Sequence, residues 1–260
     1  MLVQHAQRVA LHNEIHARPP EAMDAPLSLS HVVMVCDASQ RDASWAHMAA
    51  LARDHHLPEP VAGSTHVRMD MGPYRVRWEL HTEFVTWTFM RRLNAEQFGE
   101  REPESALDAV PQRWFAALPG ECLANLHLWV LPSAAFESVS LVKHVLYEET
   151  LVASTVADGF AEVYTDFAVH ADGFSRMVLL TGALAPRRLG RLVQCLLEIE
   201  TYRMAALLGL PAAREASMVL ASAERELAEL AHSIRSATRD DEPLLLDRLT
   251  RLAGEVESQH

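Results

Sequence analysis

The chain has 260 residues, 49% of them hydrophobic, and a formal net charge of −12 at pH 7. Such a chain can bury one large core, or one core and an appendage. The negative charge argues against non-specific nucleic-acid binding and against docking on anionic lipid, because both need clustered lysine and arginine.

The cysteines indicate a reducing compartment. Cys36, Cys122 and Cys195 are far apart, odd in number, and each lies in an apolar run, so we expect buried free thiols. The first twenty residues lack the basic start and apolar run of a signal peptide. We find no uninterrupted apolar run long enough to cross a bilayer.

Helix and strand patterns alternate in the first part of the chain. Segment 3–16 predicts a helix that ends before Pro19, because proline disfavours helical geometry in the residue before it. The β-branched run 27–36 predicts a buried strand, and 39–55 an amphipathic helix. Antiparallel strands are predicted over 67–72, 74–84 and 85–93, and Gly72-Pro73 marks a tight turn between the first two.

A charged, proline-bounded stretch, 94–111, is typical of a long loop. Beyond it, a helix is expected over 138–147, and apolar runs predict strands over 123–131, 151–157, 160–169 and 174–180. A further helix is predicted from Pro186 to Leu208, ending at Gly209.

The composition changes at Ala212. From there the chain is rich in Ala, Glu, Leu and Arg, and apolar residues recur every three or four positions, for example at Leu227, Leu230 and Ile234. We therefore predict a sheet domain, 1–211, and a helical appendage, 212–260. The fold class is α/β (α+β), a mixed sheet sandwiched by helices. The appendage is a C-terminal helical hairpin, a stalk, or a bundle packed on the same domain.

Four sequence blocks together resemble a known family. They are LHNEIHARPP (11–20), WELHTEF (78–84), YTDFAVHADGFSR (164–176) and GRLVQCLLEIETYRMAALLGLP (190–211). They are similar to a bacterial family of uncharacterised membrane-anchored proteins, of the domain of unknown function 3422 type. The resemblance implies a position at the cytoplasmic face of the inner membrane, anchored through a segment absent from this chain. It also implies a helix-then-membrane plan similar to that of CorA-type magnesium channels, and it brings no established activity.

An H-x-E-x-H pattern lies near the start of the chain. His12 and His16 are four residues apart and share a helical face, so they could hold one metal, whereas Glu14 would point elsewhere. The alternative is that these side chains cap and fix the N-terminal arm.

Glu79, His81 and Glu83 alternate, and on a strand they would share one face. Two carboxylates beside an imidazole suit proton transfer or a divalent metal. The same alternation is also what the solvent-facing side of a hairpin produces.

A second polar block surrounds the Asp172-Gly173 turn. Asp166, His170 and Asp172 share strand parity, and Arg176 lies close enough to pair with Asp172. Such groups form a structural ion-pair network, or bind a divalent cation or an anionic ligand. The candidate metal ligands, for Zn, Mn or Mg, are His81, Glu83, Asp166 and His170. The candidate ligand-binding residues are His16, Arg18, Asp172, Arg176, Glu198, Glu200 and Arg203.

The sequence contains no G-x-S-x-G elbow and no phosphate-binding glycine loop. The leading hypothesis is therefore a binding, regulatory and oligomerisation module that forms a homo-oligomer through its C-terminal helices. The alternatives are a metal-dependent hydrolase and a divalent-cation sensor.

Overall fold

The structure is a computed structural model that describes residues 5, 8, 20–94, 103–133 and 138–257. It divides into two compact units, Met1–Thr201 and Tyr202–His260. The boundary lies within α5 (Pro186–Leu207), whose first part belongs to the unit that contains the sheet.

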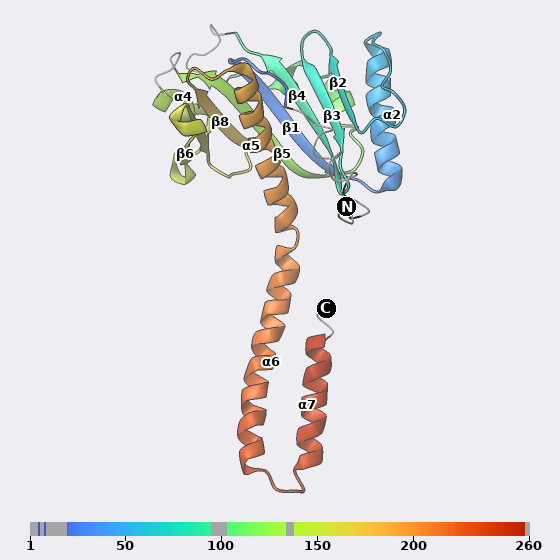
Figure 1. The fold of residues 1–260 in the computed structure, drawn as a ribbon, viewed down its shortest axis with the longest axis vertical. Coiled ribbons are helices and arrows are strands. Elements are labelled where there is room, and N and C mark those ends of the chain that lie inside the picture. The colour runs from blue at the N-terminus through green and yellow to red at the C-terminus, as the bar shows by residue number, and fades with distance from the viewer. Residues whose placement is uncertain (1–4, 6–7, 9–19, 95–102, 134–137, 258–260) are drawn as a thin grey trace, which may run out of the picture. The chain divides into compact units, whose positions relative to one another are not determined.

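Eight strands form one sheet in the first unit, in the order β2-β3-β4-β1-β5-β8-β7-β6 (Figure 1). β5 and β8 pair in parallel, and the other neighbouring strands pair antiparallel, so the sheet is mixed, as predicted. The strands are β1 (Leu27–Val35), β2 (His66–Asp70), β3 (Arg75–Leu80), β4 (Phe84–Arg92), β5 (Glu121–Pro132), β6 (Val152–Val156), β7 (Ala161–Thr165) and β8 (Ser175–Thr181).

Helices cover both faces of this sheet, which confirms the predicted α+β sandwich. On one face, α2 (Ala38–Asp54) packs Met48 and Leu51 against a core that includes Trp78 and Trp87. α4 (Ser138–Val145) packs against the cluster around Trp129, and the short α3 (Gln112–Phe115) contributes partly buried aromatics to the α2 core. Because side chains alternate along a strand, the opposite face presents Leu29, Leu128 and Leu179 to α5.

The start of α2 is fixed by a capping box. The Asp37 carboxylate accepts the Gln40 N–H at 2.8 Å, and the Gln40 side chain accepts the Asp37 N–H at 2.9 Å. Two backbone donors that helix geometry leaves without partners are satisfied in this way. The sequence prediction placed this helix within a residue of its actual ends.

The chain ahead of β1 lies against the start of α5. The Met23 N–H donates to the Pro186 carbonyl at 3.0 Å. A Cβ placed on Gly190 would lie 1.6 Å from the Glu21 carbonyl oxygen, so this position admits no side chain without a backbone shift. Glycine is therefore required where the two segments approach.

Two strands end earlier than the alternating sequence indicated. β3 ends at Leu80, so His81, Thr82 and Glu83 form a turn closed by the His81 N–H donating to the Phe84 carbonyl. β7 ends at Thr165, so the residues from Asp166 to Phe174 form a loop. The prediction was wrong in these places because side-chain parity cannot show where the backbone leaves the sheet.

The second unit contains a helical hairpin, one of the arrangements predicted. α6 (Leu210–Ser236) and α7 (Glu242–Glu257) pack through a small core formed by Ala223, Leu230 and Leu252 (Figure 1).

The cysteine prediction was correct in one respect and wrong in another. All three thiols are free, but only Cys36 is buried, whereas Cys122 and Cys195 are exposed.

Candidate functional site

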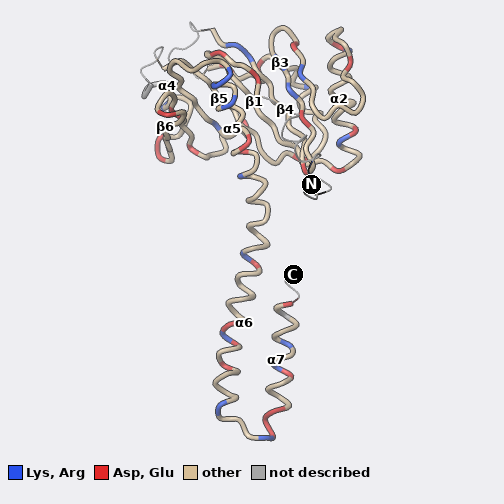
Figure 2. The backbone as a smooth tube through the Cα atoms, viewed as in Figure 1, with Lys and Arg blue, Asp and Glu red and all other residues tan. Residues whose placement is uncertain are grey.

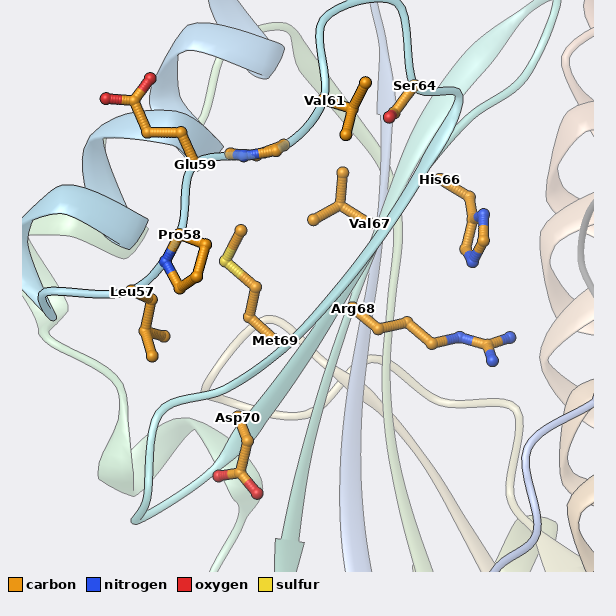
Figure 3. Close-up of a pocket in the computed structure, with 11 residues that line it drawn as sticks. Leu57, Pro58, Glu59, Val61, Ser64, His66, Val67, Arg68, Met69 and Asp70 are labelled. Atoms are coloured by element: carbon orange, nitrogen blue, oxygen red, sulfur yellow. The ribbon is translucent and has the colours of Figure 1, made fainter.

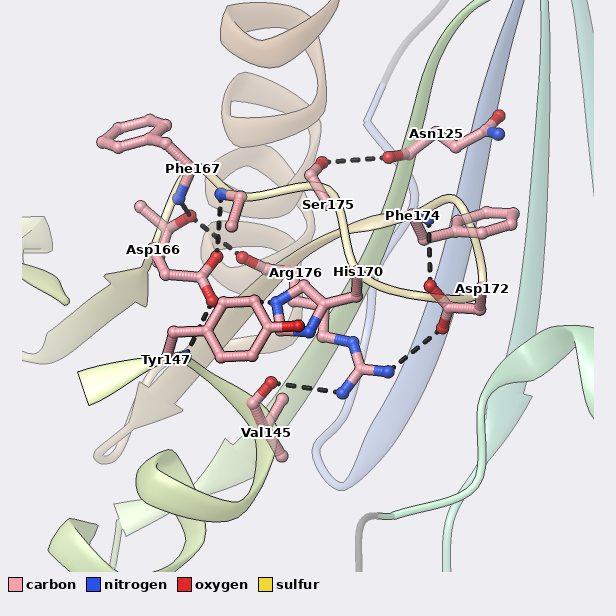
Figure 4. Close-up of polar contacts among 12 residues, drawn as sticks. Asn125, Val145, Tyr147, Asp166, Phe167, His170, Asp172, Phe174, Ser175 and Arg176 are labelled. Carbon is pink, nitrogen blue, oxygen red and sulfur yellow. Dashed lines mark hydrogen bonds and ion pairs between the residues drawn. The ribbon is translucent and has the colours of Figure 1, made fainter. Parts of the chain in front are cut away.

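A polar network fills the loop that connects β7 to β8 (Figure 4). Asp166, 3% exposed, accepts the Tyr147 N–H at 2.9 Å and the Ala168 N–H at 3.1 Å. Its carboxylate also lies 2.8 Å from Nε2 of His170. These hydrogen bonds satisfy a buried carboxyl group whose burial without partners would be costly. The same contacts turn the backbone out of β7, which explains where the strand ends.

His170 is held on two sides. Its ring stacks on Tyr147, with centroids 4.3 Å apart and planes 6° from parallel. Its backbone N–H donates to the Phe174 carbonyl at 2.9 Å. Phe167, inside the same loop, adopts a left-handed conformation with φ of 53°. Non-glycine residues persist in that region when surrounding contacts determine the backbone, as the Asp166 bonds do here.

Arg176 connects this loop to its surroundings. One guanidinium nitrogen donates to Asp172 at 3.1 Å, which confirms the predicted pair, and another donates to the Val145 carbonyl at 3.2 Å. Burial opposes ionisation of Asp172, but the Phe174 N–H and the Arg176 guanidinium outweigh it and hold the pKa of this carboxyl below its ordinary value. Asp172 is therefore charged at neutral pH and pairs with Arg176.

His127 of β5 completes the network, and the sequence analysis missed it. Its Nδ1 lies 2.8 Å from the Ser30 hydroxyl, and its ring stacks on Phe174 with centroids 4.0 Å apart. Burial lowers the pKa of His127 to about 4, although the Asp172 carboxylate 3.8 Å from Nε2 opposes the shift. The available signal was a histidine in the apolar run 123–131, which is expensive to bury without partners.

A second buried histidine, His31 of β1, connects the sheet to α5. Its Nε2 lies 3.1 Å from the Thr201 hydroxyl, which donates its own proton to the Leu197 carbonyl. Thr201 must therefore accept, which assigns the proton to Nε2 and leaves Nδ1 to accept from the Thr88 hydroxyl at 2.8 Å. Burial, reinforced by the nearby Arg77 and His81, lowers the pKa of His31 to about 3. His31 is thus a neutral link between the two layers.

Arg77 and Glu79 form a buried ion pair on β3, with a guanidinium nitrogen 3.3 Å from the carboxylate. They are 3% and 6% exposed, so Glu79 does not lie on the solvent-facing side of the hairpin. His81 and Glu83 do not share a strand face with it either, because they belong to the β3–β4 turn. The alternation that suggested one polar face of Glu79, His81 and Glu83 was therefore misleading.

The remaining candidate residues are dispersed. Glu198 is exposed and accepts from Gln194 at 2.8 Å, whereas the buried Glu200 lies 3.4 Å from the Ser175 hydroxyl of β8. Arg203 belongs to the second unit. His12, Glu14, His16 and Arg18 lie outside the described residues.

The proposed metal ligands meet only in part. Asp166 and His170 are in contact, whereas His81 and Glu83 lie at the end of β3, and three strands separate β3 from β8 in the sheet. Within the described part of the chain, no three His, Cys, Asp or Glu side chains come close enough to hold one metal ion. Asp166 and His170 by themselves supply two donors, fewer than the three protein ligands of an ordinary zinc site.

The network in Figure 4 is thus suited to holding a loop rigid. The Asp166–His170 pair resembles the orienting half of a catalytic triad, but a triad also needs a nucleophile within reach of the imidazole. The side-chain partners of His170 are Asp166 and Tyr147. The described contacts of this pair fix the path of the chain between β7 and β8 and connect it to Tyr147.

The hollow shown in Figure 3 lies elsewhere, beside β2. It has a volume of about 470 Å³ and is bounded by β2 and the segment 57–64. Apolar side chains, among them Leu57, Val61 and Met69, line much of it, together with Glu59 and Asp70. None of the predicted site residues within the described part of the chain lines this hollow.

The sequence pattern of one family, described as "Protein of unknown function (DUF3422)", matches residues 3–260. The chain belongs to the DUF3422 family. Comparisons with curated proteins and with solved structures gave no match. The family assignment agrees with the resemblance seen in the four sequence blocks, and it supplies no activity.

Proposed function

We propose that this DUF3422 chain is an assembly and binding module that associates with a second copy of itself through the α6–α7 hairpin. The observation that supports this proposal is a set of exposed apolar side chains on α6 and α7, two helices that bury few of their own apolar side chains. Leu227, Ile234, Leu246 and Leu249 are 51%, 55%, 65% and 42% exposed. Solvated leucine and isoleucine in such a group usually mark a surface that another molecule covers.

The spacing of these side chains favours a helical partner. Leu220, Leu227 and Ile234 recur at seven-residue intervals on α6, which places them on one face of the helix, as in a coiled coil. Near the turn of the hairpin, a hollow of about 400 Å³ is lined by Ile234, Leu245, Leu246 and Leu249. We call Leu220, Leu227, Ile234, Leu246 and Leu249 the hairpin strip.

A second copy is the occupant that best fits the hairpin strip. A matching hairpin offers the same apolar spacing, and the two pairs of helices would enclose one core, as in a four-helix bundle. Both signs of charge occur along α6 and α7 (Figure 2), and the half-buried Glu226–Arg248 pair lies within the hairpin. Mixed charge suits contact between protein helices better than contact with anionic lipid, which selects a basic face.

A membrane-spanning role for the helical stretch that covers α5 and α6 is less well supported. The stretch Pro186–Ser236 is long and apolar enough to cross a membrane by length and composition. Helices of soluble proteins pass the same test, and this stretch contains Arg214 beside Glu215. A charged side chain at the centre of a bilayer costs about 2.5–3.5 kcal/mol or more. Anchoring through a segment outside this chain, at the cytoplasmic face of an inner membrane, stays a prediction.

The test compares two double variants of the 260-residue chain by sedimentation equilibrium. Leu227→Glu with Ile234→Glu adds two charges to the hairpin strip, and we expect the association to weaken at least a hundredfold, since the buried apolar contacts would be replaced by desolvated carboxylates. Ala221→Glu with Ala228→Glu adds the same charges to exposed positions of α6 about a third of a turn away.

The control variant should retain the mass of the unmodified protein. Equal masses for the unmodified protein and the Leu227→Glu/Ile234→Glu variant at every concentration would overturn the proposal. The hydrolase and cation-sensor alternatives stay untested predictions, and no specific observation on the described residues favours either.

A further inference from the structure

The last strand of the sheet, β6, has an unusual surface for a sheet edge. Its sequence is Val-Ala-Ser-Thr-Val, it carries no charge, and its first four residues are exposed. Natural sheets protect their edges with charged residues, proline, bulges or very short strands, because an open edge pairs readily with another strand. β6 has the length of an ordinary strand and none of the first three devices.

The register of the neighbouring strands shows which backbone groups of β6 face outward. The Gly182 N–H donates to the Phe160 carbonyl at 2.8 Å, so Phe160 and every second residue of β7 after it bond to β8. The intervening residues Ala161, Val163 and Thr165 therefore bond to Val156, Ser154 and Val152 of β6. The N–H and C=O groups of Ala153 and Thr155 point away from the sheet.

We infer that β6 pairs antiparallel with β6 of a second copy, about a twofold axis that passes beside Ser154. In this register Ala153 faces Thr155 of the other copy and Thr155 faces its Ala153, which gives four N–H···O bonds. The arrangement is isologous, so each copy contributes the same surface. The two eight-stranded sheets would become one continuous sheet across the axis.

The side chains of β6 permit this pairing. Ala153 and Thr155 lie on one face, and Val152, Ser154 and Val156 on the other, so Val152 (47% exposed) would pack beside Val156 of the second copy. The absence of charge on β6 means that the twofold axis brings no like charges together within the strand, although the chain as a whole is strongly acidic.

A second copy fits better than a foreign extended peptide. Short 3₁₀ turns, Glu148–Thr150 and Ala157–Gly159, bound β6 closely at both ends. A partner strand can therefore pair with β6 over about five residues only, and this is the length that another β6 offers. The inference rests on the sheet edge alone and is independent of the hairpin strip.

Disulfide crosslinking tests this register directly. The background is the 260-residue chain with Cys122→Ser and Cys195→Ser, which remove the exposed thiols. In this background, Ser154→Cys places a thiol at the twofold axis, opposite the same position of the second copy. Residues opposite one another in a non-hydrogen-bonded pair have Cβ atoms about 4.5–5.5 Å apart, close to disulfide geometry. Thr155→Cys is the matched control, because it lies on the same exposed strand but two residues out of register with its counterpart.

We expect the Ser154→Cys variant to form covalent dimers at least tenfold faster than the Thr155→Cys variant under mild oxidation. Equal rates, or no covalent dimer from either variant, would overturn the inference.

A second measurement separates this contact from the hairpin contact. Ala153→Pro removes an outward N–H and leaves the bonds to β7 in place. Added to the Leu227→Glu/Ile234→Glu variant, it should convert the remaining dimer to single chains without changing the circular dichroism spectrum. Where Leu227→Glu/Ile234→Glu has already weakened the association, a dimer that persists after Ala153→Pro is added would contradict pairing through β6.

Discussion

The two units of this chain bury apolar residues to very different degrees. In the sheet unit, Trp78, Trp87 and Trp129 are at most 1% exposed, with helices on both faces of the sheet. In the described part of the hairpin unit, Ala223, Leu230 and Leu252 form the buried core, while other leucines, such as Leu246, remain exposed to solvent. The sheet unit therefore encloses an extensive core of its own, whereas the hairpin leaves exposed the apolar side chains that the proposed contact with a second copy would cover.

The largest effect should come from the core of the sheet unit. Trp87→Ala removes a fully buried indole that packs edge-on against Trp78 and Trp114. We expect the free energy of unfolding, measured by urea denaturation, to fall by about 3–5 kcal/mol. Leu246→Ala in the hairpin is the control, and a similar loss in both variants would contradict the contrast between the units.

Asp166 extends the contrast to polar groups. Asp166→Ala leaves the Tyr147 and Ala168 N–H groups and the His170 imidazole without their acceptor. Leaving a buried hydrogen-bond donor without an acceptor costs about 1–3 kcal/mol, so a loss near 3 kcal/mol is expected by thermal or urea unfolding. Asp166→Asn retains an acceptor oxygen and should cost less. Equal losses would show that the charge, and not the hydrogen bonding, stabilises the loop.

Stability of the sheet unit should also depend on pH through its buried histidines. In the folded state the pKa values of His31 and His127 are about 3 and about 4, below the ordinary 6.5. Between pH 6.5 and 4 the unfolded chain therefore binds protons that the folded chain does not, and stability falls as the pH falls. The slope is about 1.4 kcal/mol per pH unit for each such histidine.

His127→Gln should reduce the slope of unfolding free energy against pH by about the contribution of one histidine, about 1.4 kcal/mol per pH unit. Its measurement is a series of urea titrations across that pH range. A slope that the substitution does not change would argue that His127 is protonated in the folded state.

The smallest effect should come from the hairpin's own ion pair. Arg248 lies 3.4 Å from Glu226, and both side chains are about a third exposed. Arg248→Ala should lower the stability by no more than about 1 kcal/mol, because exposed pairs are weakened by solvent and side-chain entropy. A much larger loss in the assembled protein would place this pair inside the proposed hairpin contact and would revise the contrast.

The candidate site illustrates what a sequence pattern can and cannot predict. The Asp172–Arg176 pair followed from spacing alone, since the two residues flank one turn. His81 and Glu83 do not meet Asp166 and His170, because three strands separate β3 from β8 in the sheet. The sequence pattern does not reveal this strand order. His127 and His31 were missed because their partners, Ser30 and Thr201, are distant in the sequence and become neighbours only when the strands and α5 assemble.

By itself, the sequence determined the α+β class, most helix and strand positions, the change of character near residue 212 and membership of the DUF3422 family. These properties depend on local periodicity, turn residues and composition, which act over a few residues. The tertiary structure decided which polar groups meet, where β3 and β7 end, and that β6 rather than an interior strand lies at the sheet edge. Those outcomes depend on strand order and burial, which arise from contacts between segments far apart in the chain.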